Sequence, residues 1–329
     1  MNMNDEEKIF ENIARENRAE EIFKSEDCEI WKMKNSSGDG LITMYNVFPG
    51  VIVMYSDFHM SSCISEFDAT STDLLCINHC REGCMESELR AGAYYYIEKG
   101  DLCVDIRKYH AGNVNFPLNH YHGIGICFYR PIADKQLANE LSNFPVKLSD
   151  IQKKFCDNDK PHIIKASKEI EHIFSELYEV PSKIRKEYYR IKVFELLLYL
   201  DALEIDKNKF NKTYFYKSQV EKVKNIHELI TNNLAYHYTI EELSEKYDIS
   251  ATALKECFKS IYGSPIYKYI QTYRINRAAT LLRNGSNENV SQIAGHVGYD
   301  SPSKFAAAFK KTMGVTPLQY RKNNGTLPL

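Results

Sequence analysis

Two segments near the C-terminus, residues 249–263 and 300–314, carry similar residue types at an offset of 51 positions. Each has two bulky apolar residues four apart, the spacing of one face of an α-helix. Hydroxyl and basic side chains lie beside these pairs in both segments, and such groups hydrogen-bond base edges or neutralise phosphates. The repeat therefore predicts two surface helices able to contact a nucleic acid. The matched positions are Leu254, Phe258, Lys259, Gly263 and Tyr269 in one copy and Phe305, Phe309, Lys310, Gly314 and Tyr320 in the other.

The candidate contact residues are the outward-facing positions of these helices. A helix fits the major groove of B-DNA, and two linked helices can enter successive grooves about 34 Å apart. The alternative is a helical bundle whose paired turns only pack against each other. The candidates are Thr252, Lys255, Glu256 and Lys259 in the first helix, Ser303, Lys304, Ala306, Ala307, Lys310 and Lys311 in the second, and Arg274, which with Arg277 and Arg283 is expected on polar faces of the helix between them.

Signals for helix starts, turns and stops surround both segments. In each copy a short helix is followed by a turn, a capping residue and a terminal glycine, the order typical of a helix-turn-helix. The first copy shows a capping box at Thr239 and Glu242, a turn at 248–250, a cap at Ser250 and a stop at Gly263. The second shows a tight turn at Gly298, Tyr299 at the junction, a cap at Asp300 or Ser301, Pro302 in the first turn, a stop at Gly314, and a final turn opened by Thr316 and Pro317.

Charge is divided unevenly along the chain. The formal net charge of the 329 residues is −2, but residues 213–329 hold 15 Lys and Arg against 9 Asp and Glu, so they carry +6 and the rest carries −8. Such a division is typical of a polyanion-binding module attached to a body that does not bind. No apolar run approaches the roughly 20 residues of a membrane helix, and no secretory signal is present. Nine cysteines, an odd number, favour reduced thiols in the cytoplasm.

The residue types and their spacing change along the sequence before residue 213. Residues 1–24 predict a charged helix. Between 29 and 130, short β-branched and aromatic runs alternate with turn signals such as SSGDG and REG, which predicts a small antiparallel barrel or sandwich. Residues 161–203 return to the spacing of amphipathic helices. Residues 206–218 are polar, with basic residues interleaved, and are the expected linker.

The C-terminal third resembles the AraC/XylS family of transcriptional regulators. The segment AGHVGYDSPSKFAAAFKKTMGVTPLQYRK matches the family's C-terminal signature, while YRINRAATLL and IYGSPIYKYI match its bridging helix and the exit of its first helix-turn-helix. The resemblance covers residues 218–322. It implies binding to promoter DNA, usually as a homodimer, and activation through contact with RNA polymerase. By position it places Thr252, Lys255, Glu256, Ser303, Lys304 and Ala307 on the base-reading faces.

The sequence departs from the family pattern in two places. Ser244 stands where the family usually has alanine, which is a tolerable change. Ala306 and Ala307 put methyl groups where many members carry longer polar side chains. The second helix is therefore expected to use phosphate contacts, thymine methyl contacts and DNA shape more than hydrogen bonds to bases.

Family architecture implies a cupin-like sensor barrel over about 25–160 and a dimerisation and relay segment over 161–203. The stretch INHCREGCMESELRAGAYYYIEKGD resembles the PchR-like branch, whose best-known members sense ferric siderophores, so a small-molecule effector is a possible partner. The apolar faces of the relay segment either pair with a second subunit or pack on their own barrel. They comprise Ile170, Phe174, Leu177, Ile191, Phe194 and Leu198.

Three sets of residues in the barrel region are of types that can bind a metal or a ligand or react chemically. His120 and His122 have the alternate spacing of metal cupins, but no carboxylate follows them, so ordinary strand-edge histidines are favoured over a metal site. Cysteines at every fourth position flank an expected hairpin at 81–83 and are interpreted as apolar filler rather than redox or iron sensors. These are Cys76, Cys80 and Cys84. Aromatic side chains are expected in the core more than in a pocket, and Arg107 either holds an acidic ligand or is solvated. The aromatics are Trp31, Tyr45, Phe48, Tyr94, Tyr95 and Tyr96.

The sequence thus predicts an α+β protein with three parts. They are a cupin-like β-barrel sensor with an N-terminal helix over 1–160, a helical dimerisation and linker segment over 161–212, and an all-α DNA-binding domain with two helix-turn-helix motifs over 213–329. The predicted function is an effector-responsive transcription activator in the cytoplasm, not an enzyme, with no metal and no resident cofactor. Two alternatives stay open: a metal-binding or catalytic cupin barrel tethered to DNA, and a ligand-independent dimeric activator.

Overall fold

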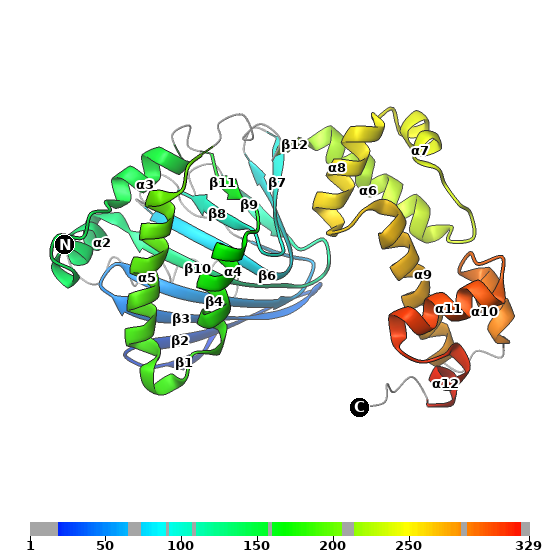
Figure 1. Cartoon of the computed structure of the whole chain (residues 1–329), viewed down its shortest axis with the longest axis horizontal. Coiled ribbons are helices and arrows are strands. Elements are labelled where there is room, and N and C mark those ends of the chain that lie inside the picture. The colour runs from blue at the N-terminus through cyan, green and yellow to red at the C-terminus, as the bar shows by residue number, and fades with distance from the viewer. Residues whose placement is uncertain are drawn as a thin grey trace. The chain divides into compact units, whose positions relative to one another are not determined.

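The structure is a computed structural model that describes residues 19–64, 74–89, 92–106, 110–156, 160–205, 214–283 and 288–323. The chain divides into two compact units, Met1–Tyr216 and Lys217–Leu329 (Figure 1). The division falls four residues beyond the one expected after residue 212. Within the described ranges, no helix has both the length and the apolar character needed to cross a membrane.

The first unit is built on one curled antiparallel sheet that forms a half-barrel (Figure 1). Its described strands follow the order β1-β2-β3-β4-β10-β6-β7-β12, while β8 and β9 also pair with β6, β11 with β8, and β5 with β9. The strands are β1 (Glu20–Lys24), β2 (Cys28–Asn35), β3 (Gly38–Phe48), β4 (Val51–His59), β5 (Ser62–Ile64), β6 (Leu74–Leu89), β7 (Ala93–Glu98), β8 (Leu102–Asp105), β9 (His110–Asn115), β10 (Tyr121–Tyr129), β11 (His162–Ile164) and β12 (Tyr214–Tyr216).

Strand β6 joins the two arms of the sheet, and it corrects one prediction. Its first half pairs with β10 and β8, and its second half pairs with β7 and β9. The hairpin expected at 81–83 is wrong, because the strand runs through these residues with a bulge. The register moves from His122 opposite Glu82 to Gly123 opposite Cys80, which leaves Arg81 as the extra residue. Gly83 follows at φ +85°, a backbone conformation that favours glycine.

Alternate residues of the sheet face two different cores. One face packs against helices α2 (Arg130–Glu140), α3 (Leu148–Phe155), α4 (Lys168–Ser175) and α5 (Arg185–Ala202), and Figure 1 shows α3, α4 and α5 lying across it. The other face closes on itself, because Phe58 and Tyr121 of one arm pack in one cluster with Tyr95 and Val114 of the other. This interior is filled with aromatic side chains, so Tyr95 is a core residue as predicted. Tyr45 and Phe48 instead pack on the helical side.

Two further predictions for the first unit differ from the structure, and others fall on residues outside the described part of the chain. Residues 20–24 form β1 rather than helix, and residues 1–18 of the expected helix lie outside the described part of the chain. Residues 162–164 form β11 before α4 begins, and two short 3-10 turns, Glu176–Glu179 and Ser182–Ile184, separate α4 from α5. Arg107 and residues 206–213 of the expected linker also lie outside the described residues.

The second unit is all-helical in its described residues. Its helices are α6 (Lys217–Asn232), α7 (Ile240–Tyr247), α8 (Ala251–Tyr262), α9 (Ile266–Arg283), α10 (Val290–His296), α11 (Pro302–Met313) and α12 (Pro317–Lys322). The long α9 contacts α6 and α8 near one end and α10, α11 and α12 near the other. Ile275, Ala278 and Leu282 of its predicted apolar stripe are buried, and Ile270 is half-buried.

Candidate nucleic-acid interface

Helices α7 and α8 form the first helix–turn–helix, and local signals fix where each begins. The Thr239 hydroxyl accepts the Glu242 N–H, and the Glu242 carboxylate accepts the Thr239 N–H at 2.8 Å, which completes the predicted capping box. Asp248 ends α7 at φ +48°, in the left-handed region that Asp tolerates better than most residues. Ser250 then caps α8 by accepting the Ala253 N–H, as predicted. The turn therefore sets the direction in which α8 leaves.

Helices α10 and α11 form the second helix–turn–helix. Of the two predicted caps, Ser301 is the one used, since its hydroxyl accepts the Lys304 N–H. The ring of Tyr299 packs on Phe305 with centroids 5.4 Å apart, which agrees with its predicted place at the junction. A second capping box, formed by Asn289 and Gln292, begins α10. The prediction missed it, although the Asn-x-x-Gln spacing is visible in the sequence.

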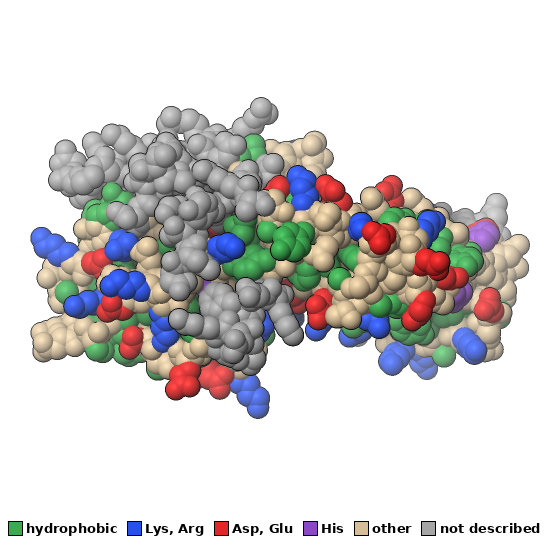
Figure 2. Space-filling model, turned by 90° about the horizontal axis from the view of Figure 1, so that it is seen from above, with side chains coloured by type: hydrophobic (Ala, Val, Ile, Leu, Met, Phe, Trp, Pro, Cys, Tyr) green, Lys and Arg blue, Asp and Glu red, His purple; other side chains and the backbone are tan. Residues whose placement is uncertain are grey.

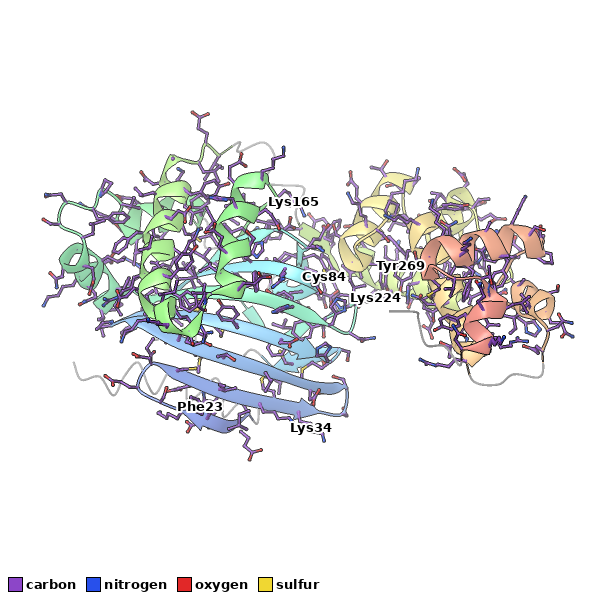
Figure 3. The ribbon with its side chains drawn as sticks, turned by 60° about the horizontal axis from the view of Figure 1, so that its bottom comes forward. Phe23, Lys34, Cys84, Lys165, Lys224 and Tyr269 are labelled. Atoms are coloured by element: carbon purple, nitrogen blue, oxygen red, sulfur yellow. The ribbon has the colours of Figure 1, made fainter. Side chains whose placement is uncertain are left out.

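The sequence repeat extends to the packing behind each outer helix. Tyr269 lies edge-on to Phe258, with centroids 5.5 Å apart and planes at 78° (Figure 3 labels Tyr269). Its counterpart Tyr320 lies edge-on to Phe309, with centroids 5.4 Å apart and planes at 75°. Both copies thus use the same aromatic pair to hold the outer helix. Near the first pair, Nε2 of His227 is hydrogen-bonded to the Tyr269 hydroxyl at 2.9 Å. Burial lowers the pKa of His227.

The candidate contact residues lie on the surface of the two outer helices. In α8 the buried face carries Leu254, Phe258 and Ile261, and all four candidates on the remaining faces are exposed: Thr252, Lys255, Glu256 and Lys259. In α11 the buried face carries Phe305 and Phe309, and five candidates are exposed: Ser303, Lys304, Ala307, Lys310 and Lys311. Ala306 is half-buried. Figure 2 shows basic side chains of the C-terminal unit gathered along one margin of the view.

Helical geometry orders the exposed residues of α11. At about 100° per residue, Ala307 points directly away from the buried Phe305 and Phe309, and Ser303 and Lys311 lie to either side of it. Lys304 and Lys310 lie on opposite sides of that centre. The middle of the outer face therefore offers the Ala307 methyl group with a hydroxyl on one side and an ammonium group on the other, and further ammonium groups lie at its borders.

Arg274 differs from its predicted place on a polar face. Its side chain is only 8% exposed, and its guanidinium is used inside the unit. Nη2 donates to the carbonyl oxygens of Leu234 at 2.6 Å and Tyr236 at 3.2 Å, and Nη1 donates to the carbonyl of Gly298 at 3.2 Å. Arg274 is therefore an internal tie between the loop before α7 and the turn of the second helix–turn–helix, and the prediction of a DNA contact is corrected. Arg277 and Arg283 are exposed, as predicted.

The histidines and cysteines that the sequence offered as metal or redox candidates do not lie together at one site in the described part of the first unit. The Nδ1 atom of His120 lies 3.0 Å from the Leu118 carbonyl oxygen, while the ring of His122 packs edge-on to Tyr178. In the ranges that the structure describes, no three His, Cys, Asp or Glu side chains are placed to hold a metal ion. The thiols of Cys76, Cys80 and Cys84 are buried, and burial raises the pKa of the latter two well above the ordinary value. Low reactivity follows, as expected of apolar filler.

Comparisons with known proteins agree with this geometry. A family described as "Helix-turn-helix domain" matches residues 243–323, which run from α7 to the end of α12. The HTH-type transcriptional activator RhaR of Mannheimia succiniciproducens is 25% identical over 238 residues, spanning 71% of this chain and 76% of that protein. A putative AraC-like transcription regulator of Streptomyces lividans is 36% identical over 89 residues, which cover 27% of this chain and 29% of that protein.

Among solved structures, the C-terminal domain of AraT, a response regulator from Geobacillus stearothermophilus, is 31% identical. That match covers 31% of this chain and 84% of that domain, with a TM-score of 0.30. The family match falls on both helix–turn–helix units, because residues 243–323 include most of α7 and all of α8, α10 and α11. The chain is accordingly similar to transcriptional regulators of the AraC family, and residues 243–323 match a helix-turn-helix domain family.

Proposed function

We propose that this regulator activates transcription by placing α8 and α11 in two successive major grooves of promoter DNA. The exposed outer faces of the two helices, each held from behind by the same aromatic pair, carry the proposal. The proposal includes contact with RNA polymerase and a location in the cytoplasm. The similarity to the activator RhaR supports activation rather than repression. The proposed DNA contacts are Thr252, Lys255, Glu256, Lys259, Ser303, Lys304, Ala307, Lys310 and Lys311.

The two helices divide the work of recognition. In α8, Thr252 and Glu256 lie opposite the buried face, and a carboxylate there can accept from the amino group of cytosine. In α11, the Ala307 methyl suits a thymine methyl, and Lys304 and Lys310 flank it at positions suited to phosphates. We therefore infer that α8 supplies most of the hydrogen-bonded base reading and α11 most of the backbone contact.

This division predicts different outcomes for one substitution in each helix. Lys310→Ala is expected to weaken binding to all sequences alike and to lower the slope of log K against log salt by about 0.9, the value for one phosphate. Glu256→Ala is expected to relax specificity at one base pair by about 1–3 kcal/mol. Titration of the full-length protein with duplexes from its own upstream region, at several salt concentrations, measures both quantities.

Lys168→Ala is the matched control, because it makes the same change of net charge on an exposed residue of the first unit. It is expected to leave the salt slope unchanged. If the wild-type protein bound its upstream region no better than random duplex at moderate salt, the proposed function would be rejected. Equal effects of Lys310→Ala and Glu256→Ala on every sequence would reject the division between the helices.

We also infer that the regulator is a homodimer and that α5 forms the contact. Ile170, Phe174 and Leu177 are buried against the chain's own sheet, so the packing alternative holds for them. The outer side of the α5 region is different, because Ile184, Ile191 and Leu198 are 49%, 64% and 46% exposed. Their spacing of seven residues places them on one side of the helix. A stripe spaced evenly about Ile191 is complementary to its own inverse, which suits an antiparallel pair about a two-fold axis.

The dimer contact can be tested with one buried charge. Ile191→Glu would place a carboxylate at the centre of the two-fold contact, facing its own copy, and is expected to convert the dimer to a monomer. Leu141→Glu is the control, because Leu141 is also exposed, at 45%, but lies just after α2. Sedimentation velocity of the full-length proteins measures the result. A wild-type monomer, or a dimer that survives Ile191→Glu and not Leu141→Glu, would contradict the assignment to α5.

A further inference from the structure

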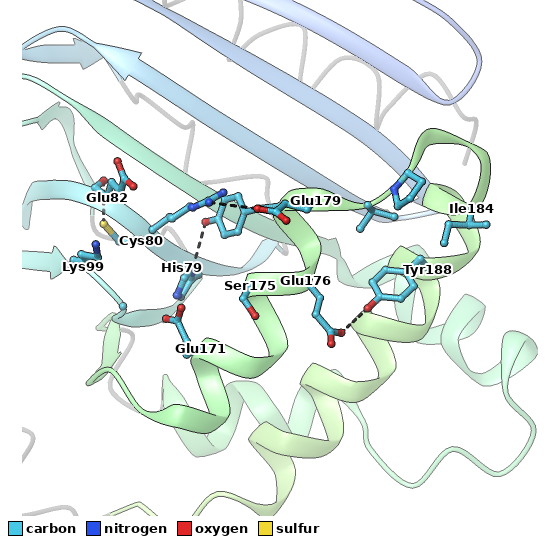
Figure 4. Close-up of a pocket in the computed structure, with 15 residues that line it drawn as sticks. His79, Cys80, Glu82, Lys99, Glu171, Ser175, Glu176, Glu179, Ile184 and Tyr188 are labelled. Atoms are coloured by element: carbon cyan, nitrogen blue, oxygen red, sulfur yellow. Dashed lines mark hydrogen bonds and ion pairs between the residues drawn. The ribbon is translucent and has the colours of Figure 1, made fainter. Parts of the chain in front are cut away.

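A cavity of about 730 Å³ opens on the helical side of the first unit (Figure 4). Its floor is the middle of β6, at the bulge, and its walls come from the turn between β7 and β8, from α4 and from the start of α5. Of its lining residues, Cys80 alone also belongs to the aromatic interior between the two arms of the sheet. The volume is within the range of about 300–1,000 Å³ that accommodates small-molecule ligands.

The floor of the cavity contains a buried polar atom without a partner. His79 is 3% exposed, and its ring stacks on Phe174 with centroids 4.3 Å apart. Its Nδ1 atom lies 3.3 Å from the hydroxyl of Tyr178. Its Nε2 atom is buried and has no hydrogen-bond partner among the described residues. Burial lowers the pKa of His79 to about 4, so the imidazole is neutral near pH 7. When Nδ1–H donates to Tyr178, Nε2 presents a lone pair that a ligand donor can complete.

The walls of the cavity carry more acceptors than donors. Four glutamates line it, against Arg81 and Lys99. Two of the glutamates are engaged, since Glu176 pairs with Lys192 at 2.7 Å and Glu179 lies 4.0 Å from Arg81. The Arg81 guanidinium is further held 4.5 Å above the Tyr178 ring. The other two, Glu82 and Glu171, have side chains that form no ion pair with any described residue.

We propose that this cavity binds a small organic amine as the effector of the regulator. Its ammonium group donates to the Glu171 carboxylate and to Nε2 of His79, and the carbon skeleton rests on the exposed part of the Tyr178 ring. The excess of carboxylates excludes anions and favours an ammonium group over a neutral hydroxyl, and the unpartnered imidazole nitrogen accepts one hydrogen bond from the ligand. This assignment rests on the proposed effector-responsive function. It also gives a route to the DNA-binding form, because Ile184 and Tyr188 line the cavity and lie at the start of the proposed dimer helix.

The test compares amines with neutral molecules of the same shape. Calorimetric titration of the full-length protein uses 1,4-diaminobutane against 1,4-butanediol, and glucosamine against glucose. At least one amine is expected to bind, and its neutral partner is expected to give no heat. Glu171→Gln is expected to weaken amine binding by about tenfold, the loss of one charge-assisted hydrogen bond. His79→Phe is expected to do the same, because it keeps the stack on Phe174 and removes Nε2.

Glu169→Gln, two residues earlier on α4 and outside the cavity lining, is the control and should bind the amine like the wild type. Melting temperatures check that each variant is folded, and Glu171→Gln decides the matter if His79→Phe is not, since Glu171 is exposed. The proposal is overturned if neither amine binds at millimolar concentration, if the neutral partners bind equally well, or if Glu171→Gln has no effect. An amine that binds a protein without promoter preference would support the site and reject the proposed function. Promoter preference without amine binding would do the reverse.

Discussion

Arg274→Met is expected to lower the free energy of unfolding of the C-terminal unit by about 3 kcal/mol. Methionine retains much of the apolar stem but provides no donors, so the carbonyls of Leu234, Tyr236 and Gly298 lose their guanidinium partner. Hydrogen bonds from a charged donor contribute about 1.5–3 kcal/mol each, and buried acceptors left without a partner add a further cost. Since the three carbonyls belong to two loops, both loops should loosen together, and DNA affinity should fall with stability.

Two spectroscopic signals can separate the units in this experiment. The single tryptophan, Trp31, lies in the first unit, so its fluorescence follows that unit, whereas far-ultraviolet circular dichroism also reports the helices of the second. Urea unfolding of Arg274→Met should shift the circular dichroism transition to lower urea and leave the Trp31 transition in place. Arg277→Met, exposed and one turn along α9, should change stability by no more than about 0.5 kcal/mol. A stable Arg274→Met variant that lost only DNA affinity would restore Arg274 as a DNA contact.

The helix boundaries of the C-terminal unit were predictable because their causes are local. A capping side chain bonds an N–H three residues away, and a terminal glycine adopts its own left-handed conformation. Thr239, Ser250 and Gly314 could thus be assigned from neighbours in the sequence. The role of Arg274 could not, because its partners come from 24 to 40 residues away in the chain. An arginine beside an apolar stripe has the same local pattern whether it is solvated or buried.

The first unit shows the same limit for strands. The REG sequence at 81–83 fits a hairpin and a bulge equally well, since both use a glycine with positive φ. The choice was made by β10, whose residues 121–129 pair along both sides of the bulge. The cavity at His79 could not be predicted from the sequence either. Its floor and wall come from β6 and α4, which are about 90 residues apart, and the sequence of neither element indicates that the two are in contact. Conversely, the exposed stripe on α5 is visible as a seven-residue repeat, but only packing tells it apart from the buried faces of α4.

Gly298→Ala is expected to be the most damaging single methyl group in the C-terminal unit, at about 3 kcal/mol or more. Gly298 has φ +81°, and a Cβ there would lie 2.1 Å from the Leu234 carbonyl oxygen and 2.8 Å from the Arg274 guanidinium carbon. A residue other than glycine in this conformation costs about 1–2 kcal/mol, and the backbone contact must then be relieved by moving the loop. The turn that aims α11 would shift with it, so promoter affinity should fall even where the unit still folds.

Two other glycines of the unit separate these causes. Gly314→Ala also has positive φ, at +75°, but its Cβ would meet nothing within 4 Å, so it should cost only about 1–2 kcal/mol. Gly295→Ala, inside α10 and equally open, should stabilise the helix by up to about 1 kcal/mol. Urea unfolding of the three variants gives the steric cost at Gly298 by difference, and a Gly298→Ala variant no weaker than Gly314→Ala would refute the close contact. Because the new methyl would press on the very groups that Arg274 joins, Gly298→Ala combined with Arg274→Met should cost less than the two substitutions added together.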